Sequence, residues 1–504
     1  MNIAQAKETI KNTIGLYLKK DEFGDYRIPV VRQRPIFLLG APGIGKTAIM
    51  EQIAQEMGVA LVAYSMTHHT RQSALGLPFI THKTYGEEEF AVSEYTMSEI
   101  IASVYDTMEE SGVREGILFL DEINCVSETL APSMLQFLQY KVFGRHSVPD
   151  GWVIVTAGNP PEFNRSVREF DVVTMDRMKL LEVEPDLDSW MKYARERGLH
   201  GAVLGYLELK KEHFYVMEMT AKGRSYVTAR GWEDLSQILK LYEEEELKAD
   251  EALIGQYLHN QRVVKEFGAY YDLYCKYKRD YHISEILEGE VSPSTIARAK
   301  SARFDERISL VSMLLDRVLQ DCRSVMGRAD VMTQIAPVFR TLKEKAQSLS
   351  GEEAAQMLGS AGQGKEKQLK TLKTAGALSD AEKAKLKAAI QVFDEAQRTI
   401  RVSGARSGEE AFAAASGYYG KAVAQLQKEA EGVQKELRNL FGFSKEAFAE
   451  GNELLLLLTQ LTVSDYGARF IGTFGSPEYE ALSRDLMVSE RRNELAQEIA
   501  KLDL

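Results

Sequence analysis

The stretch Gly40-Ala41-Pro42-Gly43-Ile44-Gly45-Lys46-Thr47 follows a short apolar run and decides how this chain folds. Its pattern, G-x-x-x-x-G-K-T, is typical of a loop whose backbone N–H groups surround nucleotide phosphates, and glycines let the backbone approach them closely. Lys46 is expected to neutralise phosphate charge, and Thr47 to offer its hydroxyl to Mg²⁺. A helical pattern follows up to Met57, so a helix N-terminus also faces the anion. The sequence therefore predicts a nucleoside triphosphate site.

A second motif, Gly116-Ile117-Leu118-Phe119-Leu120-Asp121-Glu122, places two carboxylates after four apolar residues. This is typical of a buried parallel strand that ends at a ligand site. Asp121 is predicted to hold Mg²⁺ through water, and Glu122 to act as general base for the attacking water. A plain strand that enters a polar turn is the alternative, which the phosphate loop upstream disfavours. The predicted cofactors are ATP and Mg²⁺, and the predicted metal ligands are Thr47 and Asp121. The predicted cofactor-binding residues are Gly40, Ala41, Pro42, Gly43, Ile44, Gly45, Lys46, Thr47, Ala48 and Asp121.

Composition excludes several classes of protein. The chain has 504 residues, of which 44% are hydrophobic and 27% charged, so it can hold several domains with a sizeable core. The leucine run at 454–458 is too short to span a bilayer, and the first twenty residues lack a signal-peptide core. Cys125, Cys275 and Cys322 fit neither a metal site nor paired disulfides. We therefore expect a cytoplasmic protein without a membrane partner, and the net charge of -12 argues against nonspecific nucleic-acid binding.

Apolar runs alternate with helical patterns in the first part of the chain. An amphipathic helix is predicted over 2–20. Strands that alternate with helices indicate a doubly wound parallel sheet, so the predicted fold class is α/β. Two β-hairpin insertions interrupt the alternation, at 75–92 and 140–151, and a plain surface hairpin is the alternative for each. The predicted strands lie at 35–39, 59–64, 117–120, 152–156 and 179–183.

Strand patterns stop after Pro185, and the remainder is predicted to be helical. We expect a nucleotide-binding domain at 1–185, an all-α lid at 186–345, and a linker with a long helical C-terminal extension at 346–504. The lid is predicted to contain helices at 225–242 and 252–277.

The predicted linker lies at 351–377, where Gly, Ser, Gln and Lys dominate and indicate a flexible or weakly helical segment. We expect proteolysis to cut there first and truncation before it to leave a folded motor. Beyond the linker, Ser379-Asp380-Ala381-Glu382 resembles a capping box that begins a helix. A heptad seam follows at 423–440, too short for a confident coiled coil, which favours an intramolecular antiparallel hairpin over a dimer zipper.

The two motifs, together with Gly158-Asn159-Pro160-Pro161 after the fourth strand, resemble an AAA+ ATPase. Finer motifs are similar to the MoxR family: Gly76-Leu77-Pro78 at the start of an insertion, Pro149-Asp150-Gly151-Trp152 before the fourth strand, and Ala157-Gly158-Asn159-Pro160. Residues 175–183 and 228–232 are also similar. The resemblance covers residues 30–245 and implies a P-loop AAA+ sheet with β-hairpin inserts, followed by an all-α lid.

The resemblance also implies catalytic roles for Asn159 and Arg230. Asn159 resembles the sensor that positions water against the γ-phosphate, a task that suits an amide because it both donates and accepts. A turn-forming asparagine before proline is the alternative. Arg230 resembles the second sensor, on the lid, and a surface arginine at a helix start is the alternative.

Arg177 resembles the arginine finger that reaches the active site of the neighbouring subunit, where its planar, charged fork stabilises the transferring phosphoryl group. The family usually has Phe after this arginine, whereas this chain has Met178. Arg165 and Arg168 are close enough in sequence to compete for the role.

Other suggestive residues have simpler interpretations. His68 and His69 lack a third ligand at suitable spacing, so solvent-exposed or hydrogen-bonded histidines are favoured over a metal site. The acidic run at 243–246 is most simply a solvated helix face.

The resemblance implies an ATPase that forms a hexameric ring and remodels, matures or loads cofactor or metal into a protein client, with a von Willebrand factor A domain partner. One alternative is a nucleotide-dependent scaffold or switch with slow turnover. Another is a nucleic-acid motor, whose hairpin tips should be basic. Lys83 is followed by Glu87-Glu88-Glu89, which disfavours a motor, although Lys141 and Arg145 leave the second hairpin open.

Overall fold

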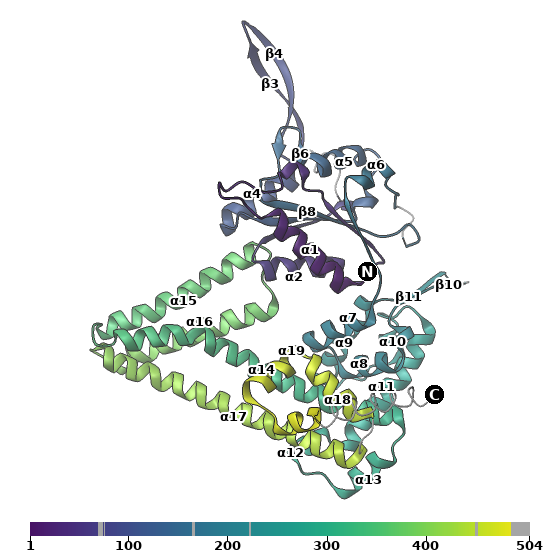
Figure 1. Cartoon of the computed structure of the whole chain (residues 1–504), viewed down its shortest axis with the longest axis vertical. Helices are drawn as coiled ribbons and strands as arrows, with labels where there is room; N and C mark the ends of the chain where they lie inside the picture. The colour runs from purple at the N-terminus through teal and green to yellow at the C-terminus, as the bar shows by residue number, and fades with distance from the viewer. Residues whose placement is uncertain (69–73, 75, 164–166, 221–222, 449–451, 485–504) are drawn as a thin grey trace, which may run out of the picture. The chain divides into compact units, whose positions relative to one another are not determined.

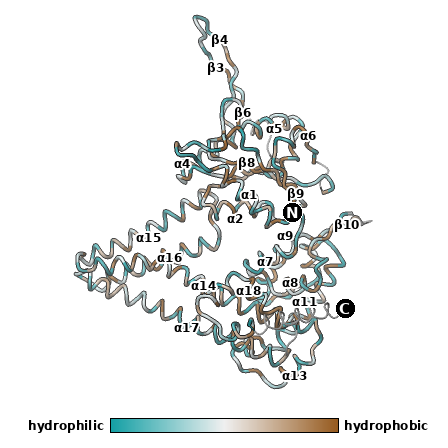
Figure 2. The backbone as a smooth tube through the Cα atoms, viewed as in Figure 1, coloured by the Kyte–Doolittle hydropathy of each residue, from teal (hydrophilic) through white to brown (hydrophobic). Residues whose placement is uncertain are grey.

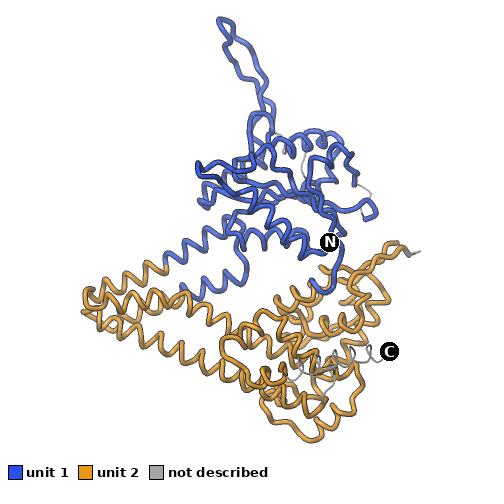
Figure 3. Tube along the Cα trace, viewed as in Figure 1, with its two compact units in different colours: residues 1–189, 363–390 blue, residues 190–362, 391–504 orange. Residues whose placement is uncertain are grey.

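The structure is a computed structural model that describes residues 1–68, 74, 76–163, 167–220, 223–448 and 452–484. The chain divides into two compact units, shown in different colours in Figure 3. Unit 1 comprises residues 1–189 and 363–390, and unit 2 comprises residues 190–362 and 391–504. Among the described residues, no helix is both long and apolar enough to cross a membrane.

Unit 1 contains a five-stranded parallel sheet with the strand order β2-β5-β8-β1-β9. All five predicted strands and the predicted α/β fold class are confirmed. The central strands are apolar and buried because helices cover both faces of the sheet, and Figure 2 shows the hydrophobic residues concentrated there. The strands are β1 (Ile36–Gly40), β2 (Ala60–Ser65), β5 (Gly116–Asp121), β8 (Trp152–Gly158) and β9 (Lys179–Val183).

Helices α1 and α2 lie on one side of this sheet, and α5 lies on the other (Figure 1). Helix α1 begins with a capping box at Asn2, and α2 begins directly after the phosphate loop. The helical segments of this region are α1 (Ile3–Tyr17), α2 (Lys46–Met57), α4 (Glu99–Ser111), α5 (Ala131–Tyr140) and α6 (Val172–Asp176), with short 3-10 turns η1 (Val30–Arg32), η2 (Met66–His68) and η3 (Ile123–Cys125).

Both predicted hairpins are confirmed. Strands β3 (Pro78–Tyr85) and β4 (Glu88–Tyr95) form the long one, and β6 (Val142–Phe143) with β7 (His146–Ser147) forms the short one. Glu94 on β4 pairs with Lys83 on β3 and with Arg145 at the tip of the short hairpin. An ion pair between Glu94 and Arg145 therefore joins the long hairpin to the short one.

Unit 2 is mostly helical, with an aromatic core in which Tyr206, Trp232 and Phe267 pack edge to face or tilted. Its elements, including the helices α7, α15 and α16 that extend into unit 1, are α7 (Leu187–Arg197), α8 (Gly201–Leu209), η4 (Lys211–His213), β10 (Val216–Thr220), β11 (Gly223–Val227), α9 (Ala229–Glu244), α10 (Glu251–Ile254), α11 (Gln261–Tyr281), α12 (Ile283–Glu288), α13 (Pro293–Ser301), α14 (Phe304–Lys345), α15 (Gly351–Thr374), α16 (Asp380–Ser403), α17 (Gly408–Phe448), α18 (Asn452–Val463) and α19 (Asp465–Phe474).

Three predictions for the lid need correction. Strands do not stop after Pro185, because β10 and β11 form an antiparallel hairpin. The helix predicted at 225–242 instead begins at Ala229, where the Thr228 side chain caps it. The helix predicted at 252–277 is divided into α10 and α11, and Asn260 caps the second part.

The segment at 351–377, predicted to be flexible or weakly helical, is a continuous helix, α15, over most of its length. The predicted N-cap at Ser379 is confirmed, since its hydroxyl accepts a hydrogen bond from the Glu382 N–H at 3.1 Å. The heptad residues Ala430, Val433, Leu437 and Leu440 are buried on α17, which packs on α14 of the same chain. This agrees with the predicted packing within one chain.

Candidate nucleotide site

The phosphate loop connects the carboxyl end of β1 to α2. Gly43 and Gly45 have positive φ angles of 74° and 96°, which glycine adopts without strain. Lys46 begins α2 and is buried, and its Nζ donates to the carbonyls of Gly40 at 2.8 Å and Ala41 at 2.9 Å. These local contacts hold the ammonium group inside the loop, where it can neutralise phosphate charge.

Thr47, in the first turn of α2, and Asp121, the last residue of β5, meet in the site. The Thr47 hydroxyl donates to Asp121 Oδ2 at 2.9 Å. A hydroxyl and a carboxylate are hard oxygen ligands of the kind that Mg²⁺ prefers, and Mg²⁺ keeps several waters when so few protein ligands hold it. The pair therefore fits the predicted metal site.

Glu122 follows Asp121 with a left-handed backbone, at φ 55° and ψ 36°. This conformation is uncommon for a residue with a side chain and is typical of functional sites. Its Oε2 accepts hydrogen bonds from the hydroxyls of Ser65 at 3.1 Å and Thr67 at 3.0 Å. The carboxylate is thus held by residues at and just after the end of β2.

Asn159 follows β8 and reaches the phosphate loop. Its Oδ1 accepts a hydrogen bond from Lys46 Nζ at 2.8 Å, so the predicted sensor and the predicted phosphate-binding lysine are in contact. Its backbone carbonyl accepts from Asn124 Nδ2 at 2.8 Å. Asn124 is 4% exposed, and its Oδ1 has no hydrogen-bond partner among the described residues.

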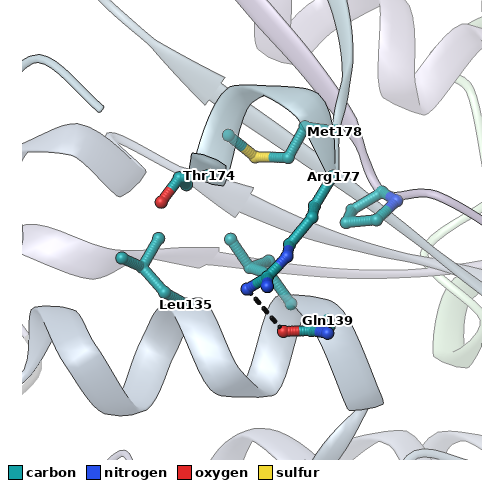
Figure 4. A pocket seen from close by; sticks show the side chains of 7 residues that line it. Leu135, Gln139, Thr174, Arg177 and Met178 are labelled. Atoms are coloured by element: carbon teal, nitrogen blue, oxygen red, sulfur yellow. Dashed lines mark hydrogen bonds between the residues drawn. The ribbon is translucent and has the colours of Figure 1, made fainter. Parts of the chain in front are cut away.

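Arg177 lies at the other end of the strands, just before the first residue of β9. Strand β9 is parallel to β1, with Lys179 opposite Ile36 and Val183 opposite Gly40. The phosphate loop follows β1, whereas Arg177 precedes β9, and five residues of strand span about 16 Å. The guanidinium is exposed and donates to Gln139 Oε1 on α5 at 2.8 Å, as Figure 4 shows.

Residues 35–178 match the family model for the AAA domain of the dynein-related subfamily. The chain contains an AAA domain. A search of the curated proteins found no match. The AAA domain includes the phosphate loop, Asp121, Glu122, Asn159 and Arg177, and a domain of this family is a nucleotide-dependent ATPase.

The other candidate arginines are less closely tied to the site. In the AAA domain, Arg168 pairs with Glu128 at 2.5 Å, and its backbone N–H donates to the carbonyl of Asn124 at 2.9 Å. Arg165 lies outside the described residues. Arg230 is exposed in the first turn of α9, in unit 2, so its predicted role as a sensor stays a prediction.

Sequence reasoning missed Ser65, Thr67 and Asn124 in this AAA domain. Ser65 lies opposite Asp121 in the register of β2 and β5, so a polar residue at the end of a neighbouring strand was the available signal. His68 ends η2, whereas His69 lies outside the described residues. Among the described residues, no cluster of three or more His, Cys, Asp or Glu side chains is suited to a metal.

Proposed function

We propose that this chain is a Mg²⁺-dependent, MoxR-like ATPase that forms a ring, with a hexamer as the expected form, and uses hydrolysis to remodel a protein client or load it with a cofactor or metal. The observation that carries the proposal is the meeting of five residues at the carboxyl ends of the strands. They are Lys46, Thr47, Asp121, Glu122 and Asn159. These residues supply phosphate binding, metal binding, a general base and a polar sensor.

The position of Arg177 supports assembly. Because its own phosphate loop lies at the opposite end of the strands, an arginine finger at this position serves a neighbouring subunit. Head-to-tail contacts of that kind close into rings. A von Willebrand factor A domain partner is proposed from the MoxR resemblance.

Two observations favour a protein client over nucleic acid. Lys141 is 5% exposed, and its Nζ donates to Gln33 Oε1 at 3.1 Å and to the Trp152 carbonyl at 2.9 Å. Arg145 pairs with Glu94. Both basic residues that left the second hairpin open to a nucleic-acid role therefore already have hydrogen-bond or ion-pair partners within unit 1. Measuring ATPase stimulation by single-stranded DNA and by a von Willebrand factor A domain protein distinguishes the two.

Glu122→Gln tests the ATPase assignment. The variant removes the group that activates water, so we expect hydrolysis to slow by about a hundredfold or more while ATP binding persists. Lys46→Ala should instead weaken ATP binding, and Glu110→Gln, an exposed substitution on α4, is the control. Equal turnover of Glu122→Gln and wild type would exclude Glu122 as the base, and slow turnover in the wild type would favour the scaffold or switch.

A further inference from the structure

Strand β2 is at the edge of the sheet, so its outer N–H and C=O groups need partners from outside the sheet. The turn between α15 and α16 supplies one. The Leu61 N–H donates to the Ala375 carbonyl at 2.8 Å, and Ala375 and Ala377 are only 1% and 4% exposed. A segment more than three hundred residues away in the sequence therefore covers the β2 edge.

The approach of this turn to β2 requires glycine at position 376. Gly376 has a φ of 65°, and a Cβ there would lie 2.7 Å from the carbonyl oxygen of Leu61. Any side chain must displace the backbone of the turn or of β2. The backbones of the turn and of β2 are therefore in close contact, with no room for a side chain between them.

The same strand carries the groups that hold Glu122. Ser65 is the last residue of β2, Thr67 follows it, and their hydroxyls are the donors to Glu122 Oε2. Ser65 lies four positions after Leu61 in the same strand, or about 13 Å along it. A shift of β2 at Leu61 therefore reaches the hydroxyls through one short strand.

The helices on either side of the turn form an antiparallel hairpin that is also fixed at its base. There the Gly351 N–H donates to the Arg406 carbonyl at 3.0 Å, and the Gly408 N–H donates to the Leu349 carbonyl at 2.8 Å. Both α15 and α16 continue without a break from unit 2 into unit 1. The chain thus passes between the units within both helices as well as at 189–190, and the turn contacts β2 through a backbone hydrogen bond.

We infer that the α15–α16 turn is a positioning element for the ATPase reaction: its docking on Leu61 fixes β2, and β2 fixes Glu122 through Ser65 and Thr67. The inference rests on the proposed ATPase function and adds a route by which unit 2 acts on turnover.

The test compares Gly376→Ala with Gly404→Ala in the full-length protein. Gly404 has the same φ of 65° but nothing within 4 Å of a Cβ, so it carries the same backbone strain without the contact. We expect Gly376→Ala to speed amide exchange in β2 and to lower kcat roughly tenfold, as a small misplacement of a catalytic group does, with an unchanged KM for ATP. Gly404→Ala should change neither β2 exchange nor kcat.

A combined variant identifies the route. In a Ser65→Ala, Thr67→Val background, Gly376→Ala should cause no further loss of kcat, because the path to Glu122 is already broken. An equal loss in both backgrounds, or faster β2 exchange with wild-type kcat, would overturn the inference. If Gly376→Ala does not fold, Gly376→Asn and Gly404→Asn replace the pair, since Asn tolerates positive φ better. Wild-type turnover that Glu122→Gln leaves unchanged would refute the ATPase proposal separately.

Discussion

Glu243 in unit 2 accepts hydrogen bonds from the Tyr271 hydroxyl at 3.2 Å and Lys278 Nζ at 2.7 Å, and lies 3.0 Å from His200 Nε2. Burial opposes its ionisation, but the hydrogen bonds and charges of His200 and Lys278 outweigh burial and lower the pKa of Glu243 to about 2. The prediction that residues 243–246 form a solvated helix face was therefore wrong for Glu243, which joins α8, α9 and α11.

Glu243→Gln should destabilise unit 2 at neutral pH. Because the folded-state pKa lies below the ordinary value of 4.5, the stabilisation is present above pH 4.5 and is lost as the pH falls towards 2. The shift corresponds to roughly 3 kcal/mol. Thermal unfolding between pH 7 and pH 3 should show the wild type and variant converging in acid. Glu244→Gln, which changes an exposed neighbour, should match the wild type throughout. A gap that does not depend on pH would contradict this account.

Some of the site residues could be predicted from local sequence, and others could not. The loop around Lys46 and the pair Asp121 and Glu122 were predictable because a local turn and one strand fix their spacing. Ser65 and Asn124 were not, because their contacts depend on strand order: β2 must pair with β5, and η3 must lie beside the end of β8. Elementary composition carries no information about such long-range pairings.

At the scale of elements, α15 shows where composition misleads. Its glycines suggested a linker, yet in the structure two of them permit close helix packing. A Cβ at Gly359 would lie 2.4 Å from the side chain of Gln397, and one at Gly362 would lie 3.4 Å from Phe393 Cβ, both on α16. Burial of Ala354, Ala355 and Leu358 then outweighs the low helix propensity of glycine.

Gly364→Ala should stabilise α15. The position is exposed within the helix, and a Cβ there meets nothing within 4 Å, so the change gains helix propensity of up to about 1 kcal/mol. Gly408→Ala is the contrasting variant, because its Cβ would lie 2.4 Å from the Ala346 carbonyl oxygen at the base of the hairpin. Amide exchange of residues 351–403 should slow in the first variant and quicken in the second. Faster exchange in Gly364→Ala would indicate that α15 is not a stable helix.

At the scale of the whole molecule, the domain boundary predicted at residue 345 stays a prediction, and unit 2 runs from residue 190 to residue 362 before the chain returns to unit 1. A chain truncated there lacks the turn that pairs with Leu61 and the helix α17 that packs on α14. It would expose the β2 edge and an apolar face. Both argue against an independent motor core, which stays a prediction. Early proteolysis at 351–377 also stays a prediction, and the continuous helix α15 argues against it because a helix offers few extended sites to a protease.

Assembly gives the last prediction. Arg177→Ala should leave ATP binding by each subunit intact but reduce turnover by about a thousandfold or more, the usual cost of a lost arginine finger. Lys46→Ala protein is expected to bind ATP weakly but keeps Arg177. Mixed rings of the two variants therefore contain interfaces with an intact phosphate loop on one subunit and an intact finger on the next, and ATPase activity should partly return on mixing. Arg168→Ala, mixed in the same way, is the control because Arg168 already pairs with Glu128 in its own chain. If verified mixed rings stay at single-variant activity, Arg177 does not act between subunits.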